Sequence, residues 1–296
     1  MFNGAIVAIV TPFKNSSVDE NKLRELVEFQ IENGISGIVP CGTTGESPTL
    51  DNEEHVRVIE ICIETAKKRV PIIAGTGSNS TAEAIALTKH AAELGADGAL
   101  VVTPYYNKPT QKGLYRHFKA IADNCDIPIV LYNIEGRTAR NIDTDTVAKL
   151  SKDCKNIVGV KEASGSLAQA KAVHEACGKN FVILSGDDAL TLPMMELGGV
   201  GVISVVANIV PGDVVAMINA FNAGKKKKAL EIDAKLAPLV KAMFIETNPI
   251  PVKTAMGLLE MCSDELRLPL CEMDAINIEK LKLAMNNYGL LKGQPA

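Results

Sequence analysis

The chain has 296 residues, of which 47% are hydrophobic, and its formal net charge is −4 at pH 7. This length allows one large domain or two ordinary ones, and the apolar content is sufficient for a large core. The slight acidity excludes a broad attraction to nucleic acid or to an anionic membrane surface. No apolar stretch approaches the roughly 18 residues of a membrane helix, so we expect a soluble, cytoplasmic protein.

The seven cysteines are scattered singly along the chain, without a C-x-x-C pair, and their number is odd. This usage is typical of a reduced intracellular protein rather than of a disulfide framework or a zinc site. The four histidines fall in expected helices, and none has a second histidine or cysteine at ligand spacing. The sequence therefore predicts no metal site and no cofactor.

An apolar strand pattern alternates with an amphipathic helix pattern eight times. The strand cores are continuous apolar runs, which suit parallel strands covered on both faces. The expected strands are 5–10, 37–40, 72–75, 98–103, 127–132, 157–161, 181–185 and 200–205. Capping boxes are expected where Asp51 and Ser80 are each followed three residues later by a glutamate.

Eight strand–helix units predict an α/β fold, a (β/α)8 barrel over residues 1–224. A doubly wound open sheet is the alternative, but it would more often show a glycine-rich phosphate turn after its first strand. Helical patterns continue beyond the eighth strand, near 211–222, 225–244, 251–260 and 273–288. No linker of Pro, Gly or Ser divides these helices from the barrel. We therefore expect residues 225–296 to form an appended helical layer that packs on it.

Polar side chains gather at the carboxyl ends of the expected strands, where a barrel of this kind has its active site. Lys161 ends an otherwise apolar strand. Burial disfavours a charged amine, and a neutral amine is a nucleophile. A single strand-end lysine more often reaches solvent, so the convergence of several groups decides the interpretation. The other strand ends and the loops after them supply hydroxyls, phenols and a guanidinium: Thr43, Thr44, Tyr105, Tyr106, Tyr132 and Arg137. This set suits Schiff-base chemistry on a keto acid.

Five segments together carry a family resemblance over essentially the whole chain. They are G-A-I-V-A-I-V-T-P-F at 4–13, G-T-T-G-E-S at 42–47, T-P-Y-Y-N-K-P at 103–109, L-Y-N with R-T at 131–138, and G-V-K-E-A at 159–163. In these segments the chain resembles the 4-hydroxy-tetrahydrodipicolinate synthases, long called dihydrodipicolinate synthases, of the N-acetylneuraminate lyase superfamily. The G-T-T-G-E and K-E-A elements are shared by the wider superfamily, whereas the third segment and the R-T pair are more specific to the synthases.

The resemblance implies a lyase that condenses pyruvate with L-aspartate 4-semialdehyde to 4-hydroxy-tetrahydrodipicolinate, in the diaminopimelate route to lysine. It implies that Lys161 forms a Schiff base with pyruvate. Protons would pass through a relay of Tyr132, Thr43 and Tyr106, with Tyr106 reaching in from the neighbouring subunit. The family's usual assembly implies a homotetramer built from two tight dimers.

The resemblance also implies binding roles. Thr44 would hold the pyruvate carboxylate, and Arg137 would receive the carboxylate of aspartate semialdehyde. Gly186 and Ile203 would line the pyruvate pocket. Family members that respond to lysine bind it at the tight-dimer interface, and the positions that match a lysine effector site here are Ser47, His55, Asn79, Glu83 and Tyr105.

One departure lies just before the arginine. The family usually has Val-Pro after Tyr-Asn, whereas this chain has Ile134-Glu135-Gly136. A rigid proline is lost and a flexible glycine is gained, which changes the expected loop conformation. Glu135 is a candidate ion-pair partner of Arg137 when substrate is absent.

Other functions remain open from the residues alone. A class I aldolase or lyase for N-acetylneuraminate or a 2-keto-3-deoxy sugar acid would share Lys161 and Tyr132, but Arg137 and the segment 105–109 argue against it. A non-catalytic barrel that binds a small carboxylate would be expected to lack the nucleophile or the phenol. A phosphate-binding barrel is disfavoured by the two aspartates at 187–188, after the seventh strand, where such barrels commonly place phosphate.

Overall fold

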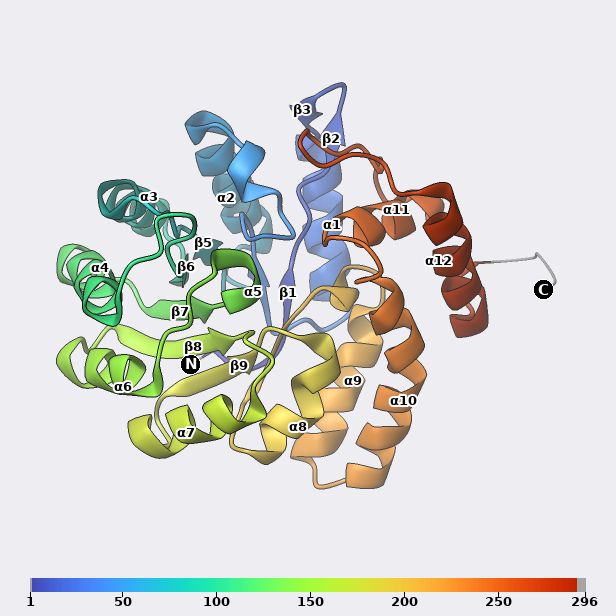
Figure 1. The fold of residues 1–296 in the computed structure, drawn as a ribbon. Helices are drawn as coiled ribbons and strands as arrows, with labels where there is room; N and C mark the ends of the chain where they lie inside the picture. The colour runs from blue at the N-terminus through green and yellow to red at the C-terminus, as the bar shows by residue number, and fades with distance from the viewer. Residues whose placement is uncertain (1, 292–296) are drawn as a thin grey trace.

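The computed structural model describes residues 2–291, which form a parallel barrel surrounded by helices (Figure 1). The barrel strands are Gly4–Ala8 (β1), Gly37–Val39 (β4), Ile73–Gly75 (β5), Gly98–Val102 (β6), Ile129–Asn133 (β7), Ile157–Glu162 (β8), Val182–Ser185 (β9) and Gly201–Ser204 (β10). They lie in the order β4-β1-β10-β9-β8-β7-β6-β5, and a parallel bridge between Ile38 and Ile72 joins the two ends. The (β/α)8 barrel is confirmed, and each expected strand lies within two residues of its expected bounds.

Helices follow the strands and cover the outside of the barrel. They are Glu20–Glu32 (α1), Asn52–Ala66 (α2), Thr81–Glu93 (α3), Gln111–Asn124 (α4), Thr144–Asp153 (α6), Leu167–Cys177 (α7), Thr191–Glu196 (α8) and Pro211–Asn222 (α9). Shorter pieces occupy the loops: the hairpin of Phe13–Lys14 (β2) and Ser17–Val18 (β3), the turn Glu135–Thr138 (α5), and the 3₁₀ turns Ser47–Thr49 (η1), Asp188–Leu190 (η2) and Val206–Asn208 (η3). None of the helices in residues 2–291 combines the length and apolarity that a bilayer crossing requires.

The two expected capping boxes have different outcomes. At α2 the box is complete, because Asp51 accepts the Glu54 N–H at 2.8 Å and the Glu54 carboxylate accepts the Asp51 N–H at 3.3 Å. At α3 the Ser80 hydroxyl accepts the Glu83 N–H, but the reciprocal half of the prediction is wrong. The Ser78 hydroxyl accepts the Ser80 N–H at 3.0 Å and donates to the Glu83 carboxylate, so it replaces that contact.

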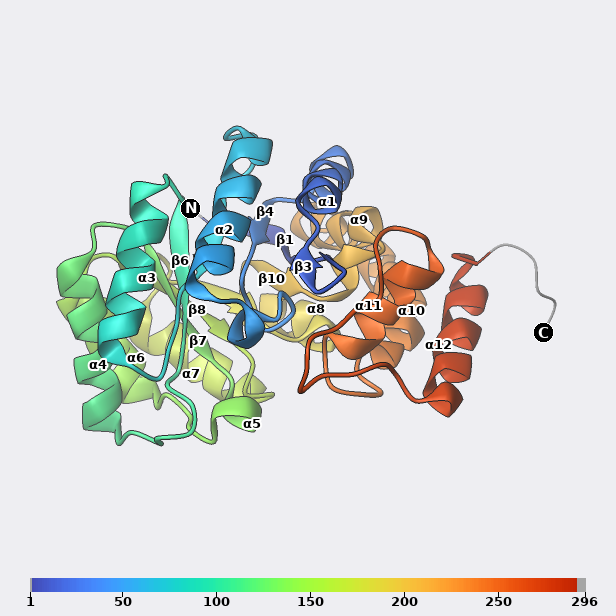
Figure 2. The same cartoon turned by 90° about the horizontal axis from the view of Figure 1, so that it is seen from above.

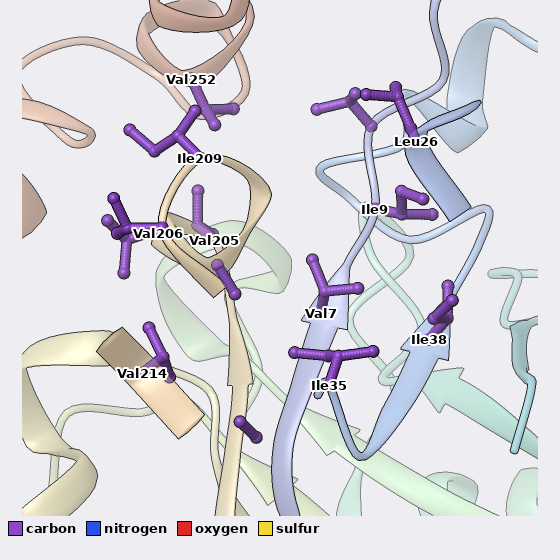
Figure 3. Packing of buried hydrophobic residues seen from close by; sticks show 14 of the residues in the cluster. Val7, Ile9, Leu26, Ile35, Ile38, Val205, Val206, Ile209, Val214 and Val252 are labelled. Carbon is purple, nitrogen blue, oxygen red and sulfur yellow. The ribbon is translucent and has the colours of Figure 1, made fainter. Parts of the chain in front are cut away.

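The C-terminal helices Lys226–Ala242 (α10), Ile250–Leu258 (α11) and Ala275–Tyr288 (α12) lie together on one side of the barrel (Figure 2). Their buried apolar side chains belong to the same cluster as those between the barrel and its outer helices. Figure 3 shows Val252 of α11 beside Ile209 at the end of η3, and both side chains are buried. The helices therefore pack on the barrel as a layer. Residues 292–296 of the expected extension lie outside the described part of the chain.

The strand register decides which side chains face the barrel interior. Tyr132 on β7 pairs with Lys161 on β8, and the next pair is Asn133 with Glu162. Because side chains alternate along a strand, the first pair faces inward and the second faces the outer helices. Tyr132 indeed belongs to the interior cluster with Ile203, Leu184 and other strand residues. This register places the lysine and the phenol side by side inside the barrel.

Candidate active site

Lys161 lies near the carboxyl end of β8 and is only 6% exposed. Its Nζ lies 4.2 Å from the centroid of the Tyr132 ring, so the amine and the expected proton donor are adjacent. Gly186, the first residue after β9, makes room for the lysine. A Cβ at position 186 would meet Ala163 Cβ at 2.5 Å and Lys161 Cε at 3.1 Å, so a larger residue there would displace the lysine side chain.

Glu162, the residue after the lysine, is a buried carboxylate on the outer side of the sheet. It accepts hydrogen bonds from Asn133 Nδ2 at 3.1 and 3.2 Å, from the Ser164 N–H at 2.8 Å and from Gln169 Nε2 at 3.2 Å. These contacts fix the ends of β7 and β8 relative to each other. The K-E-A motif therefore combines a residue facing the site with one that holds the strand behind it.

The glycine-rich turn after β4 carries Thr43 and Thr44 and is fixed by partners distant in sequence. The Thr44 hydroxyl is buried and accepts a hydrogen bond from Asn248 Nδ2 at 3.0 Å. The Thr11 hydroxyl donates to the Gly45 carbonyl oxygen at 2.7 Å. These contacts fix the position of Thr44. Thr43 is half-buried and lines a cavity.

Arg137 lies on α5, after β7, and its guanidinium contacts the C-terminal layer. Its Nη2 donates to the backbone carbonyl of Asn248 at 2.9 Å. The candidate ion pair with Glu135 is not formed: among the ion pairs of residues 2–291, none joins these two side chains, and both are exposed. The two residues are separated by two positions on one helical turn, a spacing at which side chains do not face each other.

A cavity of about 430 Å³ opens at the carboxyl ends of these strands. Three expected catalytic and substrate-binding residues line it: Thr43, Tyr132 and Arg137. Four of the five expected lysine-site residues line it as well: Ser47, His55, Glu83 and Tyr105. In the single chain, therefore, the two expected sites share one cavity.

Other expected residues lie away from the cavity surface. Lys161, Thr44, Gly186 and Ile203 are not among its lining residues in the described chain, and Ile203 is fully buried beside Tyr132. Tyr106 is 89% exposed and is not among the residues that line the cavity of its own chain. Asn79 also stands apart from the lining residues, and its carbonyl oxygen accepts Asn107 Nδ2 at 2.8 Å.

Two buried titratable groups shape the electrostatics near the site. Burial lowers the pKa of His55, whose ring nitrogens have no hydrogen-bond partner among the described residues. Burial raises the pKa of Asp188, although its carboxylate accepts the N–H groups of Val205 at 2.9 Å and Val206 at 3.2 Å. These N–H groups follow β10, where phosphate-binding barrels commonly hold their anion. An internal carboxylate, that of Asp188, occupies that position here.

The sequence did not identify Asn248 or Lys253, both of which hold the glycine-rich turn. Lys253 Nζ lies 2.6 Å from Glu46 Oε1, and both side chains are fully buried. Burial lowers the pKa of Lys253, and the adjacent Glu46 carboxylate opposes this shift. Lys253 lies inside α11 among apolar neighbours. The only signal in the sequence that could have identified it is therefore a charged residue in an otherwise apolar segment.

A family model described as the dihydrodipicolinate synthetase family matches residues 1–287. The chain is 61% identical to the 4-hydroxy-tetrahydrodipicolinate synthase of Syntrophus aciditrophicus, over 98% of this chain and 100% of that protein. The crystal structure of dihydrodipicolinate synthase from Aquifex aeolicus superposes with a TM-score of 0.97 at 52% identity, over 99% of this chain and 100% of that one. The enzyme from Cyanidioschyzon merolae, solved with lysine bound, superposes with a TM-score of 0.96 at 43% identity, over 98% and 99%. The chain therefore belongs to the dihydrodipicolinate synthetase family.

Proposed function

We propose that the chain condenses pyruvate with L-aspartate 4-semialdehyde to give 4-hydroxy-tetrahydrodipicolinate, as a lyase of the diaminopimelate route to lysine. The observation that carries this proposal is the buried Lys161 amine against the Tyr132 ring, beside a cavity that also presents Arg137. The relatives that share nearly the full length of the chain are named for this reaction. A cavity of about 430 Å³ suits two small carboxylates.

The proposed reaction follows from an amine nucleophile that needs no external electron sink. Lys161 Nζ adds to the C2 carbonyl of pyruvate, and water leaves to give a protonated imine. Loss of a C3 proton gives the enamine, whose C3 attacks the aldehyde carbon while the aldehyde oxygen takes a proton. The amino group of the condensed product then displaces Lys161 by transimination, which closes the ring and frees the lysine.

The residues nearest the amine take the proton-transfer and binding roles. Tyr132 moves protons to and from the adduct, because its ring lies against Lys161. Thr43 continues the relay at the cavity wall. Thr44 receives the pyruvate carboxylate, and Arg137 receives the carboxylate of the aldehyde substrate. Gly186 and Ile203 form the wall behind the bound pyruvate.

Borohydride reduction in the presence of pyruvate tests the mechanism, because it converts the imine into a stable secondary amine. We expect peptide mass spectrometry to find the reduced adduct on Lys161. Coupled assays then separate substrates: turnover is expected with pyruvate plus aspartate semialdehyde, and not with N-acetylneuraminate or 2-keto-3-deoxy acids. An adduct on another residue contradicts the mechanism, and cleavage of sugar acids at a higher rate contradicts the proposed substrates.

We further propose a homotetramer built from two tight dimers, in which Tyr106 completes the site of the neighbouring subunit. Its 89% exposure and its position away from its own cavity support this role. We also propose a cytoplasmic location, since all seven cysteines are free thiols, as expected in a reducing compartment. Residues 1–224 would be the catalytic barrel and residues 225–296 its extension.

Mixing two inactive variants tests whether the site is shared. Lys161→Ala and Tyr106→Ala homo-oligomers are each expected to have little activity. After dissociation and reassociation in equal amounts, about a quarter of the wild-type activity should return, because half the dimers are mixed and each mixed dimer holds one intact site. Activity assays before and after mixing, with sedimentation as the measure of assembly, give the result. Full activity of Tyr106→Ala alone, or no recovery on mixing, contradicts a shared site.

We also propose that lysine, the end product of the route, inhibits the enzyme through Ser47, His55, Asn79, Glu83 and Tyr105. The Cyanidioschyzon merolae relative was solved with lysine bound. Four of these five residues line the cavity here, and among them the Glu83 carboxylate suits an ammonium group. Inhibition requires that lysine bind one state of the enzyme better than another, so binding alone would not establish it.

Titration of lysine against the initial rate tests this site. We expect millimolar lysine to inhibit the wild type, and Glu83→Ala to raise the half-inhibitory concentration about tenfold or more, since a charge-assisted contact contributes roughly 1.5–3 kcal/mol. Glu93→Ala, an exposed glutamate on the same helix, is the matched control and should leave inhibition unchanged. If saturating lysine leaves the wild-type rate unchanged, Glu83 keeps only its contacts at the start of α3.

A further inference from the structure

We infer that Asn248 is a positioning residue whose side-chain amide directs the Thr44 hydroxyl toward the pyruvate carboxylate. This inference rests on the proposed function and extends it to the C-terminal layer. Asn248 lies between α10 and α11, is 6% exposed, and is among the residues that line the cavity. It lies outside the eight strands and the loops that join them, which form the barrel's own site.

Asn248 joins the two expected carboxylate-binding residues. Its Nδ2 donates to Thr44 Oγ1 at 3.0 Å, and its backbone carbonyl accepts Arg137 Nη2 at 2.9 Å. Thr44 follows β4 and Arg137 follows β7, so one residue of the C-terminal layer fixes groups from two distant barrel loops. The distance between the two carboxylates of the reacting substrates is set partly by this residue.

The direction of the hydrogen bond between Asn248 and Thr44 gives this contact a chemical role. A threonine hydroxyl has one hydrogen to donate and two lone pairs to accept. Because the Asn248 amide donates, it occupies a lone pair and leaves the hydroxyl hydrogen available. A carboxylate can only accept, so the hydrogen that remains on Thr44 is the one that pyruvate needs. Burial of both groups excludes water that would compete for this orientation.

The two contacts of Asn248 can be separated by mutation. Arg137 binds the backbone carbonyl, which every side-chain substitution retains, whereas Thr44 binds the side-chain amide. Loss of the side chain is therefore expected to weaken the binding of pyruvate and to leave the binding of aspartate semialdehyde nearly unchanged. A residue with a merely structural role would affect both substrates, or neither.

A double-mutant cycle on the full-length enzyme tests the inference. The variants are Thr44→Val, Asn248→Ala and the double variant, and the readout is the pyruvate concentration that gives half-maximal borohydride trapping on Lys161. Each single variant is expected to raise this concentration about tenfold, in line with the loss of one buried hydrogen bond. The double variant should not exceed the more severe single variant by more than about twofold, because both changes remove the same interaction.

Two results would overturn the inference. The first is a rise of about a hundredfold in the half-maximal pyruvate concentration of the double variant, because the two substitutions would then act independently. The second is an equal rise in KM for pyruvate and for aspartate semialdehyde. Thr254→Val, a buried hydroxyl of α11 bonded to the Ile250 carbonyl, is the matched control and should leave the trapping curve unchanged. If Asn248→Ala does not fold, the near-isosteric Asn248→Leu completes the same cycle, since it lacks the donor and adds no charge. Failure of the wild type to trap pyruvate overturns the proposed function and this inference together, whereas trapping by the wild type with an additive cycle overturns the inference alone.

Discussion

Replacing Lys161 with alanine is expected to lower kcat/KM on the order of 10³-fold or more, because it removes the amine that forms the imine. Without the imine, the C3 proton of pyruvate has no electron sink, and the other groups of the site have no intermediate to stabilise. Steady-state assays with pyruvate and aspartate semialdehyde give the loss, and borohydride treatment should leave the variant without an adduct.

The chain offers a matched control for this substitution. Lys149 Nζ lies 4.4 Å from the centroid of the Tyr115 ring, almost the geometry of Lys161 on Tyr132, but Lys149 is exposed on α6. Lys149→Ala should keep the activity within about twofold, as expected of a surface change worth less than about 0.5 kcal/mol. Near-normal activity of Lys161→Ala, or an adduct that persists on another lysine, would contradict the assignment of the nucleophile.

The barrel and the core of the site were predictable because they follow from local patterns and one topological rule. Continuous apolar runs identified the strands, and the carboxyl ends of parallel barrel strands must share one face. Lys161, Tyr132 and Thr43 therefore had to converge once eight strand–helix units were recognised. The observed pairing of Tyr132 with Lys161 shows that the strand ends were located accurately enough for this purpose.

The contacts that were missed or wrong depend on information that no local pattern contains. Asn248 and Lys253 contact partners 204 and 207 positions earlier in the chain, so their roles appear only once the C-terminal layer is folded onto the barrel. The Ser80–Glu83 box failed in one half because a neighbouring hydroxyl, that of Ser78, competes for both groups. Sequence proximity indicates possible partners, whereas geometry and competition select among them.

Replacing Lys253 with methionine is expected to lower the free energy of unfolding by about 3–5 kcal/mol, which is the usual cost of leaving one partner of a buried ion pair alone. In the described chain, the Glu46 carboxylate would then keep one donor, the backbone N–H of Arg267 at 3.2 Å. Glu46 ends the G-T-T-G-E turn that carries Thr43 and Thr44, so the KM for pyruvate should rise as well. Chemical denaturation at one fixed protein concentration measures the loss, because assembly contributes to apparent stability.

A second variant and a matched control separate the charge from the packing. Besides its ion pair with Glu46, Lys253 has its Nζ 4.2 Å from the Phe13 ring centroid. Lys235 makes the same two kinds of contact at the surface, with an ion pair to Asp213 at 2.9 Å and its Nζ 4.4 Å from the Tyr288 ring centroid. Lys235→Met should cost no more than about 1 kcal/mol, because solvent screens an exposed pair.

Adding Glu46→Gln to Lys253→Met should recover much of the lost stability, since no charge then remains buried without its partner. Recovery of stability without recovery of the KM for pyruvate would show that the Glu46–Lys253 pair positions the turn. If Lys253→Met proved no more destabilising than Lys235→Met, the buried pair would not be what fixes the C-terminal layer to the active-site turn.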